Sequence, residues 1–186
     1  MKRLSFLALF LLLAPAASGA SVLVAMDLGH LCRNADVIVH GEVLRRESGW
    51  EDGRIITRTT VRVAAALKGR PGNEVVVRSL GGVVGRTGQV AHGEARFAAG
   101  EELVLFLSDL GGEYRAVGMA QGKFRVTVEA GTGARTAVRD LSGLALARVQ
   151  RGAVKHRGHG HRTRQSLEGL FSKIAFHVAR SSAPAQ

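Results

Sequence analysis

Three histidines near the C-terminus have the residue type and the spacing of a metal site. His156, His159 and His161 stand at i, i+3 and i+5, with Gly158 and Gly160 between them. Imidazole nitrogens bind zinc, copper or nickel, so a flexible loop with this spacing could hold one of these ions. The same stretch also carries cations: Lys155, Arg157, Arg162 and Arg164. These cations would repel a dication, and no carboxylate or thiolate lies among them, so we expect weak metal affinity and no resident cofactor.

A second group of residues surrounds the single tryptophan. Arg45, Arg46 and Arg58 flank Trp50 in the sequence. An indole ring beside cations can stack on a sugar, a base or a guanidinium, which makes these four residues a candidate ligand site. The alternative is an exposed hairpin tip, because nearby acidic residues already balance the arginines.

Catalytic motifs are absent from the sequence. The chain has no Gly-x-Ser-x-Gly elbow and no His-Glu-x-x-His zinc motif. The glycine run GGVVGRTG is not followed by Lys-Ser or Lys-Thr, so it is not a phosphate loop. His92, close to Glu94, is the only remaining acid-base candidate in a loop. We therefore expect the protein not to be an enzyme.

The first twenty residues, MKRLSFLALFLLLAPAASGA, have the pattern of a secretory signal. Lys2 and Arg3 precede an apolar run, and small residues end at Ala20. The apolar stretch of about 14 residues is shorter than the ~20 that span a bilayer, which disfavours a permanent anchor. We expect cleavage near Ala20 and a secreted protein, either periplasmic or extracellular. Outside the cytoplasm the lone Cys32 has no partner in its own chain, so we expect it to be a small buried residue.

Net positive charge is concentrated at the two ends of the chain, mainly in the C-terminal part. The formal net charge is +11, but residues 21–140 hold 16 Lys and Arg against 14 Asp and Glu. Residues 141–186 hold 8 Lys and Arg against 1 acidic residue. A nearly neutral body with a basic tail, on an exported protein, argues against nucleic acid as a partner. An anionic membrane surface is a candidate partner of the tail.

Most of the body is predicted to be β-structure. Short segments with a period of two are separated by turn residues, which indicates a small barrel or sandwich. The segments 35–47 and 54–68 should form a hairpin around the turn at 51–53. The uniformly apolar segment 103–108 is typical of a strand buried on both faces, and 123–129 with 135–140 should form a second hairpin. The glycine-rich segment 81–100 is predicted to be one extended connection, and 141–149 is either a strand or a short helix.

The C-terminal part follows a different pattern. Residues 151–165 carry Gly, His and cations with few apolar residues, which predicts a solvated linker. Ser166 should cap an amphipathic helix over 166–180, followed by a disordered tail at 181–186. Its apolar face either packs on the barrel or docks on a membrane or a partner.

Residues 26–119 contain a predicted short helix with Cys32, followed by the segments "ADVIVHGEV", "VRVAAALKG", "GEELVLFL" and "YRAVG". In this order these features resemble the netrin-like, tissue-inhibitor-of-metalloproteinase-like family of OB-fold barrels. The phrases "ADVIV.GEV" and "GMAQGKFRV" also resemble uncharacterised exported bacterial proteins. The resemblance implies a five-stranded, partly open barrel used for binding. The zinc-chelating N-terminal Cys of the metalloproteinase inhibitors is not matched, because the expected mature chain starts at Ser21.

These observations combine into one prediction. We expect an all-β protein with a small OB-like (netrin-like) antiparallel barrel over 21–150, a short N-terminal helix and a C-terminal amphipathic helix. Its predicted function is that of a non-enzymatic binding module of the cell envelope or extracellular space, with a protein or glycan partner. The alternative is an inhibitor or accessory domain of an exported metalloprotease, or a weak metal-binding protein that uses the three histidines.

Overall fold

The computed structural model describes residues 22–150 and 153–182, which form twelve strands, two α-helices and one 3₁₀ helix. The predicted leader (1–20) and residues 183–186 of the predicted tail lie outside this range. In chain order the elements are β1 (Val22–Val24), α2 (Leu28–Asn34), β2 (Val37–Glu51), β3 (Arg54–Lys68), β4 (Glu74–Val84), β5 (Thr87–Val90), β6 (Glu102–Asp109), β7 (Tyr114–Ala116), η2 (Met119–Gly122), β8 (Lys123–Val128), β9 (Arg135–Asp140), β10 (Ala145–Gln150), β11 (Ala153–His159), β12 (Arg162–Ser166) and α3 (Leu167–Ser182).

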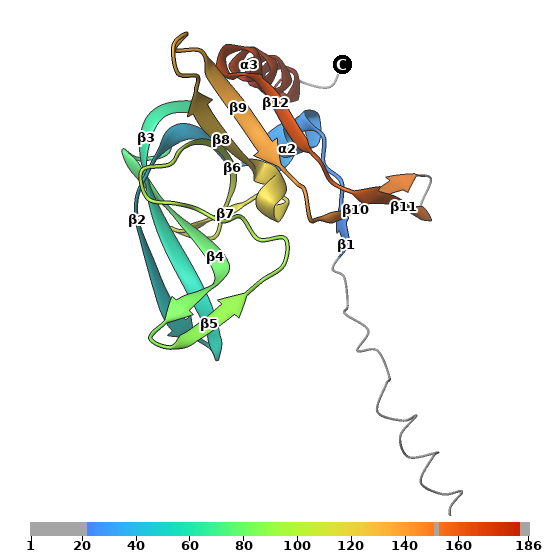
Figure 1. Cartoon of the computed structure of the whole chain (residues 1–186). Helices are drawn as coiled ribbons and strands as arrows, with labels where there is room; N and C mark the ends of the chain where they lie inside the picture. Colours follow the sequence, from blue (N-terminus) through green and yellow to red (C-terminus); the bar gives the residue numbers. More distant parts are fainter. Residues whose placement is uncertain (1–21, 151–152, 183–186) are drawn as a thin grey trace, which may run out of the picture.

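Five strands close into a barrel (Figure 1). Around the barrel the strands follow the order β6, β2, β3, β4 and β7, and β7 pairs with β6 to close it. All of these pairs are antiparallel except β4 with β7, which meet in parallel at Val77 and Tyr114. The register of β2 on β3 shifts at His40 and Gly41, where a side chain at Gly41 would collide with the carbonyl of Arg62. The predicted all-β barrel and the predicted hairpin of β2 and β3 are confirmed.

The sheet continues beyond the barrel through β8, β9 and β12. Because side chains alternate along a strand, its two faces bury different residues. The barrel face buries Val39, Val61, Leu103, Leu105 and Leu107. The other face, beneath the helices, buries Ile38, Val104, Phe106, Phe124 and Val126. Since β6 contributes to both faces, its apolar run is buried on both sides, as predicted.

Both helices pack on the same face of the sheet. The Asp27 carboxylate caps α2 by accepting from the His30 N–H at 2.8 Å. The Ser166 hydroxyl accepts from the Gly169 N–H at 3.1 Å at the start of α3, so the predicted cap is confirmed. Leu170 and Ile174 are 0% exposed, so the apolar face of α3 packs on the body of the protein. No helix in residues 22–150 or 153–182 is both long and apolar enough to cross a membrane.

The predicted linker is wrong for most of its length. Residues 153–159 form β11, which pairs with one edge of β10, while β1 pairs with the other edge. Residues 162–166 form β12. β12 pairs with β9 in continuous register from Arg162 opposite Asp140 to Ser166 opposite Thr136. These strands are held by backbone hydrogen bonds to neighbouring strands, which do not require apolar side chains. Composition therefore could not reveal them. The segment 141–149, left open as strand or helix, leads into strand β10 (Ala145–Gln150).

The glycine-rich segment is not a single connection. Residues 81–90 fold into the hairpin of β4 and β5, with Val84 opposite Thr87. Gly81 and Gly82 have φ values of 89° and 143°, a region that favours glycine. A side chain at Gly82 would also collide with the hydroxyls of Ser48 and Thr57. Only residues 91–101 remain a connection, and they lie beside the cleft described next.

Candidate functional site

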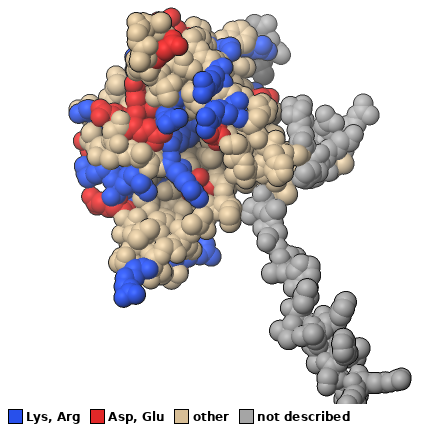
Figure 2. All heavy atoms as spheres, viewed as in Figure 1, with Lys and Arg blue, Asp and Glu red and all other residues tan. Residues whose placement is uncertain are grey.

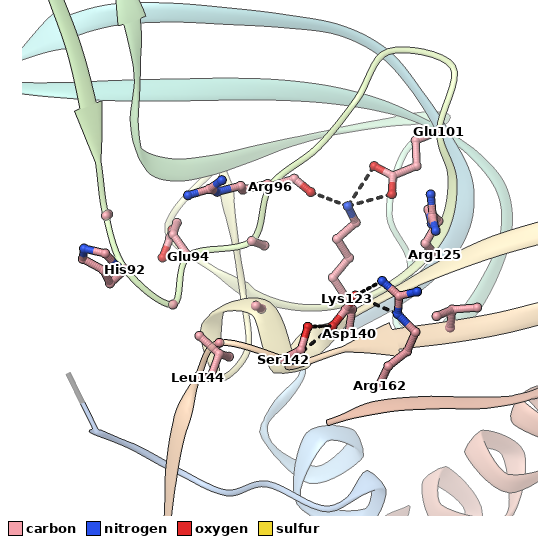
Figure 3. A pocket seen from close by; sticks show the side chains of 16 residues that line it. His92, Glu94, Arg96, Glu101, Lys123, Arg125, Asp140, Ser142, Leu144 and Arg162 are labelled. Atoms are coloured by element: carbon pink, nitrogen blue, oxygen red, sulfur yellow. Dashed lines mark hydrogen bonds and ion pairs between the residues drawn. The ribbon is translucent and has the colours of Figure 1, made fainter. Parts of the chain in front are cut away.

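A cleft of about 630 Å³ lies between the 91–101 connection and the β8, β9 and β12 part of the sheet (Figure 3). This volume falls within the ~300–1,000 Å³ typical of small-molecule sites. The charged residues that line it are Glu94, Arg96, Glu101, Lys123, Arg125, Asp140 and Arg162. Lys123 and Arg125 alternate along β8 with Phe124 and Val126, which are buried beneath the helices. The alternation therefore directs the two cations to the cleft.

Lys123 fastens the connection to the sheet. In Figure 3 its side chain reaches from β8 toward the connection. The Lys123 ammonium donates to Glu101 Oε2 at 2.8 Å and to the carbonyl oxygen of Arg96. The two side chains are only 15% and 9% exposed, and the Phe97 ring centroid lies 5.0 Å from the ammonium. We name this pair the Lys123–Glu101 latch.

Two opposing effects act on the ammonium of the latch. Burial lowers the pKa of Lys123, and the hydrogen bond and charge of Glu101 counteract that shift. The guanidinium groups of Arg125 and Arg46 lower the same pKa further. A buried charge pair in this position fixes the shape of the cleft before any ligand arrives.

Asp140 organises the opposite edge of the cleft. It accepts from the Ser142 hydroxyl at 2.5 Å, from the Ser142 N–H at 3.0 Å and from Arg162 Nε at 2.8 Å. These contacts lower the pKa of Asp140 to about 2, the Ser142 hydroxyl having the largest effect. So acidic a carboxylate is a poor base for activating the Ser142 hydroxyl. Its role in this geometry is to orient Arg162 on β12.

Glu94 separates this cleft from a second one. Its carboxylate accepts from the Leu80 N–H at 3.1 Å, and burial raises the pKa of Glu94. The second cleft, of about 850 Å³, includes Met26, Leu80, Val117 and Met119 in its lining. Its lining also includes charged side chains, among them Glu51, Arg54 and Arg78.

The cleft carries cations without a carboxylate partner. Within residues 22–150 and 153–182, neither Arg96 nor Arg125 forms an ion pair, whereas Lys123 pairs with Glu101 and Arg162 with Asp140. Figure 2 shows Lys and Arg side chains gathered in the middle of the face that Figure 1 presents. The charged groups of the cleft that are left without an ion-pair partner are therefore mainly cations.

The residues predicted around Trp50 do not form one site. Paired residues of β2 and β3 share a face of the sheet, and Arg46 lies opposite Thr59 while Arg58 lies opposite Glu47. Arg46 and Trp50 therefore lie on one face, and Arg45 and Arg58 lie on the other. Arg58 pairs with Glu51 at 2.8 Å and with Glu113 at 2.5 Å, and Trp50 is 57% exposed. Of the four residues, only Arg46 acts on the cleft, through its charge on Lys123.

The predicted histidine site is not assembled as a loop. His156 and His159 belong to β11, opposite Ala147 and Ala145, and His161 follows the strand. His159 and His161 are exposed, and the side chain of His156 lies outside the described ones. Among the described residues, no group of three His, Cys, Asp or Glu side chains is placed to hold a metal ion.

Cys32 is 0% exposed, as predicted. Burial raises the pKa of its thiol to about 11, so the thiol remains protonated at neutral pH. A protonated, buried thiol is a poor nucleophile, which fits a packing role.

A second polar cluster lies beneath α3. His40 Nε2 donates to Glu102 Oε1 at 2.6 Å, Arg135 pairs with the same carboxylate, and the Phe171 ring lies 5.5 Å away edge-on. Burial, and then the charge of Arg135, lowers the pKa of His40. The neutral ring is thus a packed part of the interface between sheet and helix.

The His40 shift predicts a pH dependence of stability. The unfolded chain takes up a proton at this residue near pH 6.5, at a higher pH than the folded chain does. The contribution of neutral His40 is therefore complete above that pH and is lost as pH falls below it. We expect the free energy of unfolding, measured in urea, to decrease less between about pH 7 and pH 5 in His40→Gln than in the unmodified protein. His92→Gln, at an exposed position, is the matched control, and identical slopes for all three proteins would refute the assignment.

Sequence patterns contained part of this site. The alternation KFRVTVE places Lys123 and Arg125 on one face of a strand, and this signal was available. The partner of Lys123 and the opposite edge of the cleft could not be found in the same way. Glu101 comes from a connection 22 residues earlier, and Arg162 comes from a strand whose composition does not indicate one. A comparison of the chain with family models and with curated proteins finds no match.

Proposed function

We propose that this protein is an exported, non-enzymatic binding module whose ligand occupies the cleft between the 91–101 connection and β8. The observation that carries the proposal is the Lys123–Glu101 latch, which holds a cleft of about 630 Å³ open with its charged groups already oriented. Preorganised walls reduce the ordering cost that binding must overcome. The leader pattern of residues 1–20 supports export.

The topology supports an OB-like, netrin-like assignment of the barrel. Taken in chain order, the first barrel strand β2 pairs with the second, β3, and with the fourth, β6, while the third, β4, pairs with the fifth, β7. Barrels of the OB type are five-stranded and bind ligands with a strand face and the adjoining loops. The cleft itself lies beside the barrel, between the 91–101 connection that leads into β6 and the strands β8, β9 and β12 that continue the sheet.

A cleft-filling substitution tests the proposal. Ala91 lines the cleft, whereas Ala99 is exposed on the same connection and does not line it. Saturation-transfer NMR with a panel of oligosaccharides and short peptides would compare Ala91→Trp and Ala99→Trp with the unmodified protein. We expect a member of the panel to bind the unmodified protein and Ala99→Trp, and to lose binding in Ala91→Trp. Binding that Ala91→Trp leaves intact, or turnover of a bound compound, would overturn the proposal.

A further inference from the structure

The acidic and the basic side chains of the cleft differ in whether they have hydrogen-bond partners. All of its carboxylates are engaged: Glu94 by the Leu80 N–H, Glu101 by Lys123, and Asp140 by Ser142 and Arg162. Arg96 and Arg125 have no such partner among the described residues. The strongest donors left for a ligand are therefore two guanidinium groups, which bind carboxylate and phosphate oxygens in a bidentate manner.

The positions of these two arginines are fixed by their neighbours. Arg125 is set by its place on β8, opposite Val138 of β9 and Leu103 of β6. Arg96 is set by the latch, because its own carbonyl accepts from the Lys123 ammonium. In Figure 3 the side chains of Arg96 and Arg125 lie on opposite sides of Lys123. A ligand in the cleft would thus meet a guanidinium from the connection and another from the sheet.

Local electrostatics adds to this preference. The charges of Arg125 and Arg46 both lower the pKa of Lys123, so each lies close enough to repel the Lys123 ammonium. An anion would relieve that repulsion. Asp140 compensates the charge of Arg162 at the edge of the cleft, so the unpaired positive charge comes from Arg96 and Arg125.

We propose that the cleft binds a soluble anion whose carboxylate or phosphate oxygens accept hydrogen bonds from the guanidinium groups of Arg96 and Arg125, which both line it. This inference rests on the proposed binding function and names the chemical class of its ligand. A free anion is favoured because both arginines line the same cleft, where one dissolved molecule can reach them. Both side chains are also exposed, so a lipid headgroup is the alternative that the experiment must separate.

Calorimetric titration of the purified protein with citrate and with inorganic phosphate tests this inference. We expect Arg125→Gln and Arg96→Gln each to weaken binding of the anion about tenfold, the effect of one charged hydrogen bond. Arg96→Gln leaves the latch intact, because Lys123 contacts the backbone of Arg96. Arg70→Gln is the control, since it removes the same charge at an exposed position outside the cleft. Its affinity should stay within about twofold.

The outcomes separate this inference from the proposed function. The anion inference alone would be overturned if citrate and phosphate did not bind, while a neutral oligosaccharide or peptide bound the unmodified protein and not Ala91→Trp. Equal loss in Arg70→Gln and Arg125→Gln would overturn it as well, because it would show a response to net charge only. Sedimentation with phosphatidylglycerol vesicles that depends on Arg125, without binding of the soluble anions, would show a lipid headgroup instead. If Ala91→Trp bound every probe as tightly as the unmodified protein does, the proposed function itself would be refuted.

Discussion

Lys123→Met is expected to lower the free energy of unfolding by about 3–5 kcal/mol, the cost of leaving a buried charge without its partner. Glu101 is the charge left behind, with a side chain that is 9% exposed. The substitution also removes the hydrogen bond to the Arg96 carbonyl, so the 91–101 connection should detach from β8. Urea denaturation followed by circular dichroism measures the loss. Faster hydrogen exchange confined to residues 91–101 would show where it arises.

Two further variants identify the cause. Lys123→Met combined with Glu101→Gln should recover a large part of the lost stability, because no ionised carboxylate then remains buried. Lys173→Met removes an exposed ammonium that, within residues 22–150 and 153–182, donates to Gln165 alone. Its effect should stay within about 0.5 kcal/mol. If Lys123→Met resembled Lys173→Met, the latch would contribute nothing and the preformed cleft would lose its support.

Ile174→Ala is expected to destabilise the protein by about 2–5 kcal/mol, as other truncations of buried aliphatic side chains do. Ile174 is 0% exposed and packs with Leu170 in the core shared by α2, α3 and the sheet. The truncation would leave a cavity there, because the surrounding sheet cannot collapse to fill it. Equilibrium urea unfolding provides the measurement.

Phe176→Ala is the matched control on the same helix. Phe176 is 56% exposed, so its truncation should change the free energy of unfolding by no more than about 0.5 kcal/mol. Equal and small effects of the two substitutions would mean that α3 is detached in solution. That result would restore the sequence-based alternative in which the helix docks on a membrane or a partner.

Local patterns were sufficient where one face of an element is buried against one neighbour. The alternation in 54–68 predicted β3, and the apolar spacing from Leu167 to Val178 predicted α3 with its cap at Ser166. Each of these signals arises from a period that the backbone itself imposes, 2 for a strand and about 3.6 for a helix. The run 103–108 of β6 was recognised differently, because a short and uniformly apolar segment is typical of a strand buried on both faces.

Patterns failed where pairing depends on the backbone alone. The polar segments 153–159 and 162–166 have no apolar period. The edge of β9 nevertheless offers backbone N–H and C=O groups, and β12 pairs with them. The glycines at 81 and 82 were interpreted as parts of a connection, although they belong to a strand that continues into a hairpin. A strand edge created by distant parts of the chain leaves no mark in the local sequence.

The sequence by itself determined the β-rich class, the terminal helix, the buried Cys32 and the presence of two cations on one face of 123–129. Only the tertiary structure decided that those cations meet Glu101 and the Arg96 carbonyl, and that Trp50 and Arg58 face opposite sides of β2 and β3. The reason is physical. Periodicity reports which side of an element is buried, whereas a binding site depends on contacts between residues far apart in the chain, and these follow from barrel closure and strand register.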